Sequence, residues 1–176
     1  MYHSYELSVN GVTIRPLTNE TSEKYRVLRN RPDISKWFTH KNEISKKQQE
    51  EWFLNYLQKS KDVMFAVFNE NETFIGANSI YDVNEKSAEY GRLIIDPLFA
   101  GKGYGAKTTY AAAVIAKTQM QLEYLSLEVY PDNVAAIRTY QKVGFKETGI
   151  TTDEHGQNMI IMKLNLIEPL SLQRML

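Results

Sequence analysis

The sequence predicts a single α/β domain built around a mainly antiparallel sheet. Its 176 residues and 43% hydrophobic content suit one domain with a sizeable core. Strand and helix patterns follow one another in the order β-α-α-β-β-β-α-β-α-β-β, with no internal repeat and no linker. Runs of consecutive strands favour antiparallel pairing, whereas a doubly wound Rossmann sheet would alternate strand and helix throughout. We therefore expect residues 1–176 to form one domain.

The chain begins with a predicted strand and a predicted helix. Val9–Arg15 is short, rich in β-branched residues and followed by Pro16, which is typical of a strand end. Residues Thr18–Thr21 offer N-capping side chains for a helix over Glu23–Asn30. Pro32 lacks the N–H group that a continuing helix requires, so the helix is expected to stop before it.

A second helix and a β-hairpin are predicted next. Ser45–Gln48 fits a capping box, in which each side chain satisfies the other residue's backbone N–H group. The helix that it opens carries four apolar side chains on one face, namely Trp52, Phe53, Tyr56 and Leu57. Val63–Phe68 and Thr73–Tyr81 are the strands of the hairpin, with a turn at Asn69–Asn71.

The second half of the chain alternates strands and helices and ends in a hairpin. The predicted elements are a strand at Glu89–Ile95 after a turn at Asn84–Ser87, an alanine-rich helix at Lys107–Lys117, a strand at Tyr124–Val129, a helix from Asn133, and strands at Lys146–Thr152 and Met159–Leu164 around His155-Gly156. The tail Ile167–Leu176 is apolar, so we expect it to pack back on the domain or to pair with a second copy in a homodimer.

Composition and charge exclude several classes of protein. Basic and acidic side chains number 21 each, so no broadly basic nucleic-acid-binding face is expected. The chain has no cysteine, which excludes disulfides and cysteine-based zinc sites, and its three isolated histidines do not suggest a metal site. No apolar run is long enough to span a membrane, and no signal peptide is visible. We expect a soluble cytoplasmic protein.

A glycine-rich turn before the alanine-rich helix is the most informative motif. Gly101, Gly103 and Gly105 alternate with other residues, so backbone N–H groups can crowd around an anion at the positive end of the helix. This arrangement indicates a pyrophosphate-binding site, although a strand-to-helix connection with no ligand would have the same sequence pattern. The spacing does not match the dinucleotide pattern Gly-x-Gly-x-x-Gly. It also misses the P-loop, because Ala106 stands where that motif needs its second glycine.

Together with a second segment, the turn resembles the GCN5-related N-acetyltransferase (GNAT) superfamily. The second segment has the pattern Asn133…Tyr140…Gly144-Phe145, which fits the last helix of that family. In the turn, Gly103 and Gly105 match the family's glycines, or Gly101 and Gly103 do so one register earlier. Ala100 replaces the family's leading arginine or glutamine. The resemblance implies a mixed, mostly antiparallel sheet of six to seven strands, flanked by about four helices and splayed between the fourth and fifth strands.

The resemblance also implies the cofactor and the residues that hold it. Acetyl-CoA would be the acetyl donor, with its pantetheine arm paired like an added strand to the backbone of Leu93, Ile94 and Ile95. The pyrophosphate would sit on Gly101, Lys102, Gly103, Tyr104, Gly105 and Ala106. The Asn133 amide would touch the pantetheine arm, and the same residue can cap its helix.

Two residues are expected to carry the chemistry. By resemblance, Tyr140 is the general acid that protonates the departing thiolate, although its helical spacing would equally suit a core aromatic. Glu89 is the leading candidate for the base that accepts a proton from the amine, directly or through a water. An exposed carboxylate at an edge strand is the alternative for Glu89. Glu128 and His40 are lesser candidates.

The N-terminal third is expected to set the acceptor. Its Arg-Asn-x-Pro sequence, its aromatic pair and the strand Leu127–Val129 resemble the branch that acetylates nucleotide-linked amino sugars, as in pseudaminic acid biosynthesis. The substrate-binding residues would be Arg29 (or Arg31) at a diphosphate, Trp37 or Phe38 under a sugar ring, and Tyr90. Trp37 and Phe38 would equally serve to close the core. Acetylation of a ribosomal-protein α-amine or of spermidine, and a non-catalytic acetyl-CoA sensor, remain as alternatives.

Overall fold

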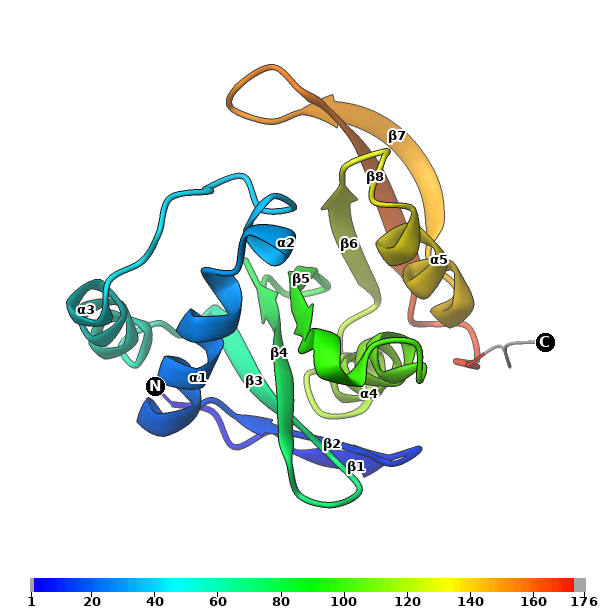
Figure 1. Cartoon of the computed structure of the whole chain (residues 1–176). Coiled ribbons are helices and arrows are strands. Elements are labelled where there is room, and N and C mark those ends of the chain that lie inside the picture. The colour runs from blue at the N-terminus through cyan, green and yellow to red at the C-terminus, as the bar shows by residue number, and fades with distance from the viewer. Residues whose placement is uncertain (1, 173–176) are drawn as a thin grey trace.

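The computed structural model describes residues 2–172, which form one sheet with helices on both faces (Figure 1). The strands are β1 (Leu7–Val9), β2 (Val12–Pro16), β3 (Asp62–Asn69), β4 (Phe74–Tyr81), β5 (Ser87–Ile95), β6 (Tyr124–Val129), β7 (Lys146–Thr152) and β8 (Asn158–Asn165). The helices are α1 (Asn19–Arg29), α2 (Pro32–Ser35), α3 (Lys46–Tyr56), α4 (Tyr104–Thr118) and α5 (Val134–Val143), with a 3₁₀ turn at Pro97–Phe99.

The sheet is mixed and mostly antiparallel, which confirms the predicted fold class. Its strand order is β1-β2-β3-β4-β5-β6-β8-β7, and β5 with β6 is the parallel pair. These two strands pair only from Ser87 to Glu89, which lie opposite Tyr124 to Ser126. Beyond Glu89 they diverge, as Figure 1 shows. This is the splay that was expected between the fourth and fifth predicted strands.

The sheet has eight strands rather than six or seven, because the first predicted strand is a hairpin. Asn10 and Gly11 have φ angles of 54° and 80°, so both lie in the left-handed region. Two such residues make the tight turn whose twist suits a two-residue β-hairpin. Reading Val9–Arg15 as one strand was therefore wrong. Pro32 likewise does more than end a helix, because it occupies the first turn of the short helix α2.

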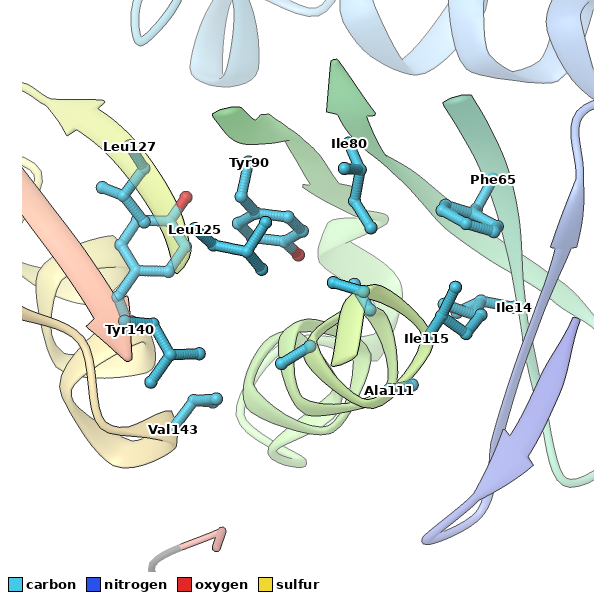
Figure 2. Close-up of a cluster of buried hydrophobic side chains, with 14 of the residues drawn as sticks. Ile14, Phe65, Ile80, Tyr90, Ala111, Ile115, Leu125, Leu127, Tyr140 and Val143 are labelled. Carbon is cyan, nitrogen blue, oxygen red and sulfur yellow. The ribbon is translucent and has the colours of Figure 1, made fainter. Parts of the chain in front are cut away.

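The two faces of the sheet carry separate cores. Helix α4 packs on one face together with α5, and its Ile115 belongs to a buried cluster with Ile14, Phe65 and Tyr90 (Figure 2). Helices α1 and α3 cover the other face in a second cluster. Leu170 and Leu172 pack on the first core, while the last four residues of the expected tail, 173–176, lie outside the described residues. No helix in residues 2–172 is long and apolar enough to cross a membrane.

Candidate active site

A cleft of about 1010 Å³ opens where β5 and β6 diverge. Its walls are β5, the glycine turn, α5 and the loop that follows α2. It brings together most of the predicted site residues, namely Arg29, Trp37, Phe38, His40, Tyr90, Leu93, Ile94, Ile95, Gly101, Gly103, Tyr104, Gly105, Ala106, Glu128, Asn133 and Tyr140. Three predicted residues lie outside this lining. Arg31, the alternative to Arg29, is exposed and paired with Asp33. Lys102 is exposed on the glycine turn, and Glu89 lies where the strands separate.

The glycine turn presents backbone N–H groups at the start of α4. Gly101 and Gly103 have φ angles of 76° and 77°, a left-handed conformation that residues with a Cβ rarely adopt. Gly103 is the N-cap and makes no side-chain capping bond, so the first-turn N–H groups of the helix have no capping acceptor. Gly105 has another role, because a Cβ there would lie 3.4 Å from the Thr139 side chain of α5. Tyr104 contributes through its backbone, since its hydroxyl donates to Glu70 at 2.8 Å.

A β-bulge shapes the β5 edge of the cleft. Arg92 has a φ of 53°, and the β4–β5 register shifts by one residue beside it. The guanidinium group is held 2.7 Å from Asp62 Oδ1 and lies 4.5 Å above the Tyr81 ring. Past the bulge, β5 pairs with β4 on one edge only, because β6 has already diverged. The other edge can therefore pair with an extended ligand.

Helix α5 brings Tyr140 to the split. Asn133 caps the helix, because its Oδ1 accepts a hydrogen bond from the Ala136 N–H at 3.3 Å. Tyr140 is 8% exposed, and Figure 2 shows its ring reaching from α5 past β6 toward Tyr90. Its hydroxyl has no hydrogen-bond partner among residues 2–172. Burial raises the pKa of Tyr140, and nearby Tyr90 and Tyr81 act in the same direction. The phenol therefore stays protonated at neutral pH and can donate its proton to a ligand.

The structure corrects the role expected for Tyr90. Its ring is 1% exposed in the core, and its centroid lies 6.1 Å from that of Tyr140 in an edge-to-face arrangement. The Tyr90 hydroxyl accepts a hydrogen bond from Asn78 at 3.2 Å and shares another with Thr109 at 3.0 Å. A side chain enclosed and bonded in this way does not reach a substrate. Tyr90 instead supports the ring of Tyr140 from below.

Two carboxylates face each other where the strands separate. Glu89 ends the paired part of β5, and Glu128 lies two residues beyond its partner Ser126 on β6. Burial raises the pKa of Glu89, the charges of Glu128 and Asp82 raise it further, and Lys163 opposes them. A carboxylate with a raised pKa is a better proton acceptor near neutral pH. Within residues 2–172, no cluster of three or more histidine or acidic side chains is arranged to hold a metal ion.

The loop after α2 covers the acceptor side of the cleft. We call residues 36–44 the strap. Asn30 fixes its far end, since the Asn30 amide donates to the Ile44 carbonyl and accepts from the Ile44 N–H, both at 2.8 Å. His40 lies 3.4 Å from Glu154, which links the strap to the β7–β8 hairpin across the cleft. No sequence pattern predicts this contact, because the two residues are far apart in the chain.

Arg29 lies beneath the strap and is 4% exposed. Its guanidinium group stacks 3.9 Å from the centre of the Phe38 ring, and Nη2 donates to the His40 carbonyl. Nη1 is buried and has no hydrogen-bond partner among the described residues. Burial lowers the pKa of Arg29. Trp37 also lines the cleft and is only partly buried. Of the predicted aromatic pair, Phe38 therefore stacks on Arg29, whereas Trp37 makes no such stack with it.

Comparison with known proteins places this fold among acetyltransferases. The family model described as acetyltransferase (GNAT) domain matches residues 12–146. A spermidine N(1)-acetyltransferase of Vibrio cholerae is 26% identical over 150 residues, which cover 82% of this chain and 86% of that protein.

Solved structures show the same architecture. The crystal structure of the Vibrio cholerae spermidine N-acetyltransferase in complex with CoA and spermine superposes with a TM-score of 0.83 at 23% identity, covering 90% of this chain and 98% of that one. An acetyltransferase of the GNAT family from Bacillus anthracis has a TM-score of 0.80 at 18% identity, with 93% and 100% coverage.

Proposed function

The chain belongs to the GNAT acetyltransferase family and uses acetyl-CoA, and from this premise we propose that it acetylates a primary amine of a small molecule by direct transfer. The observation that carries the proposal is the hydroxyl of Tyr140. It lies in the wall of the cleft, it carries its proton at neutral pH as phenols do, and it has no partner among residues 2–172. A general acid for a departing thiolate must be protonated, must reach the reacting atoms and must be free to donate its proton.

The remaining groups divide the work of holding the two substrates. The first-turn N–H groups of α4 suit the pyrophosphate of acetyl-CoA, and the unpaired edge of β5 suits its pantetheine arm. A backbone N–H of Leu93–Ile95 can polarise the thioester oxygen. The Asn133 Oδ1 is used by the helix cap, which leaves the Nδ2 branch of its amide for the pantetheine arm.

Two protons move during the transfer. The neutral amine attacks the thioester carbon, the C–S bond breaks, and Tyr140 gives its proton to the sulfur. The nitrogen loses a proton to Glu89, directly or through a water. An ordinary amine has a pKa of about 10, so it arrives mostly as the ammonium form and needs such a base. The raised pKa of Glu89 supports this role over that of a plain surface acid.

For the acceptor we propose a nucleotide-linked amino sugar, with spermidine as the second candidate. Arg29 and Trp37 support the sugar, because both line the cleft where the sequence motif placed them. The relatives of known activity support spermidine, since the Vibrio cholerae protein acts on that polyamine.

The test measures thiol release from acetyl-CoA with three acceptors. These are a UDP-linked 4-amino-4,6-dideoxy sugar, spermidine and a peptide with a ribosomal-protein N-terminus. Fast release with the sugar nucleotide supports the full proposal, whereas fast release with spermidine alone overturns the acceptor and keeps the chemistry. Absence of release with every amine, together with tight CoA binding, would favour a non-catalytic sensor.

A further inference from the structure

We propose that the acceptor carries an anionic group, a phosphate or a carboxylate, and that Arg29 is the residue that selects for it. This inference rests on the proposed function and concerns the end of the acceptor that lies away from the reacting amine. It follows from the hydrogen bonding of one buried guanidinium group and from the arrangement of charge along the cleft.

Arg29 is a buried cation without an acidic partner among the described residues. Its two observed contacts are to neutral groups, the His40 carbonyl and the face of the Phe38 ring, and Nη1 has none. Four of the other arginines are paired with carboxylates, namely Arg15 with Glu72, Arg26 with Glu23, Arg31 with Asp33 and Arg92 with Asp62. Arg138 also lines the cleft, but it is not buried as Arg29 is.

Arg92 provides the sharpest contrast, since it lines the same cleft. Its charge is compensated by a carboxylate at 2.7 Å, whereas Arg29 has no carboxylate partner among the described residues. A buried, unpaired charge is costly to keep. An anion entering the cleft would supply the missing partner, and the guanidinium fork fits the oxygen pairs of phosphate and carboxylate.

A second hollow beside the cleft also has cationic side chains in its lining. It measures about 430 Å³ and shares Trp37 and Tyr130 with the cleft, so the two spaces adjoin. Lys36 and Lys41 line it, with their ammonium groups 4.8 Å from the Trp37 ring and 5.7 Å from the Tyr130 ring. Asp132 also lines this hollow, but the two lysines outnumber it, and cationic and aromatic groups together suit a planar or cyclic body that carries negative charge.

The two ends of the acceptor path therefore have opposite charge. Glu89 and Glu128 lie at the split where the amine reacts, while Arg29, Lys36 and Lys41 lie along the way out. An acceptor with an amine at one end and an anion at the other complements this order. A polyamine is positive at both ends, so its second ammonium group would approach the guanidinium group of Arg29 and the ammonium groups of Lys36 and Lys41.

The test compares acceptors that differ in one group. The pairs are the UDP-linked amino sugar against the free amino sugar, and 4-aminobutyrate against 1,4-diaminobutane, so that phosphate and carboxylate are probed separately. The wild-type protein should use at least one anionic member more than tenfold better in kcat/KM than its partner. In Arg29→Gln this preference should collapse through KM for the anionic acceptor, with KM for acetyl-CoA unchanged.

Three controls keep the outcome clear. Arg29→Lys retains the charge without the fork and should keep part of the preference. Arg15→Gln removes a paired arginine far from the cleft and should keep all of it. Arg29→Gln removes an uncompensated buried charge, so its melting temperature should not fall, which excludes simple unfolding. Equal use of both members of each pair by the wild type, or an unchanged preference in Arg29→Gln, would overturn the inference.

A binding arm separates this inference from the proposed function. With CoA held at saturation to fill the pyrophosphate-binding site, UDP and 4-aminobutyrate are titrated by calorimetry into the wild-type protein and into Arg29→Gln. Arg29-dependent binding of at least one of these probes supports the inference even if no amine is ever acetylated. Absence of such binding refutes the inference, whereas absence of acetylation refutes the proposed function.

Discussion

Replacing Tyr140 by phenylalanine removes one oxygen atom from the cleft and leaves the packing of the ring in place. The ring packs against both Tyr90 and Phe145, with centroid distances of 6.1 and 5.8 Å, and phenylalanine keeps both contacts. The hydroxyl bonds to no other described residue, so its loss breaks no internal hydrogen bond. The variant therefore tests chemistry with little interference from stability.

The expected loss of turnover follows from the proposed role of the Tyr140 hydroxyl as a general acid. Losing acid–base help typically costs about a hundredfold or more in rate. A hundredfold fall in kcat corresponds to about 2.7 kcal/mol of transition-state stabilisation. The free energy of unfolding should change by less than about 1 kcal/mol, because no internal hydrogen bond is lost. The Kd for CoA should stay the same, since the pyrophosphate-binding site and the β5 edge are untouched.

The assay follows release of free CoA thiol at saturating acceptor, alongside calorimetric binding of CoA. Tyr90→Phe is the matched control, because it removes a hydroxyl 1% exposed beside Tyr140 that is bonded to Asn78 and Thr109. That control should lose about 1–2 kcal/mol of stability and little of its turnover. An unchanged kcat in Tyr140→Phe would refute the role of the phenol. Equal falls in kcat and CoA affinity would reduce Tyr140 to a packing residue.

Three further changes test other parts of the site. Glu89→Gln should lower kcat about a hundredfold. The pKa of Glu89 is higher in the folded than in the unfolded protein, so ionising this carboxyl group lowers the stability of the wild type as pH rises. Glu89→Gln should therefore have a higher melting temperature than the wild type at neutral pH and the same one below about pH 4. A variant that is less stable than the wild type at neutral pH would contradict this. Gly103→Ala places a Cβ on a residue with a φ of 77°, which should lower the free energy of unfolding by about 1 kcal/mol. The variant should have a higher KM for acetyl-CoA and an unchanged KM for the acceptor. Asn30→Ala removes both bonds to Ile44, so acceptor KM should rise with CoA binding intact; an unchanged acceptor KM would show that the strap does not shape the cleft.

The structural features around the cleft that the sequence predicted correctly are local ones. The glycine turn, the cap at Asn133 and the position of Tyr140 each depend on residues within one short stretch of chain. Their spacing fixes which groups share a helix end or a helix face, so the pattern suffices. The Asn10-Gly11 turn was equally local and was overlooked, although two residues that tolerate positive φ between β-branched runs are a strong hairpin signal.

The parts that the sequence did not reveal depend on distant partners. Whether Tyr90 faces the core or the acceptor is decided by Asn78 and Thr109, which come from β4 and α4. The lack of a carboxylate beside Arg29 is visible only once the strap has been placed over it. A spacing pattern carries no information on such contacts, because it describes neighbours along the chain and not across the sheet.

The bulge at Arg92 joins the two halves of the site. A left-handed residue with a Cβ costs about 1–2 kcal/mol, so the conformation needs support from outside β5. The ion pair with Asp62 on β3 and the stack on Tyr81 of β4 provide it, and both lie on the face that carries α1 and α3. On the opposite edge, the same stretch of β5 presents the backbone that suits the pantetheine arm. The contacts that hold the bulge therefore lie on one face of the sheet, while the backbone edge that it shapes lines the cleft.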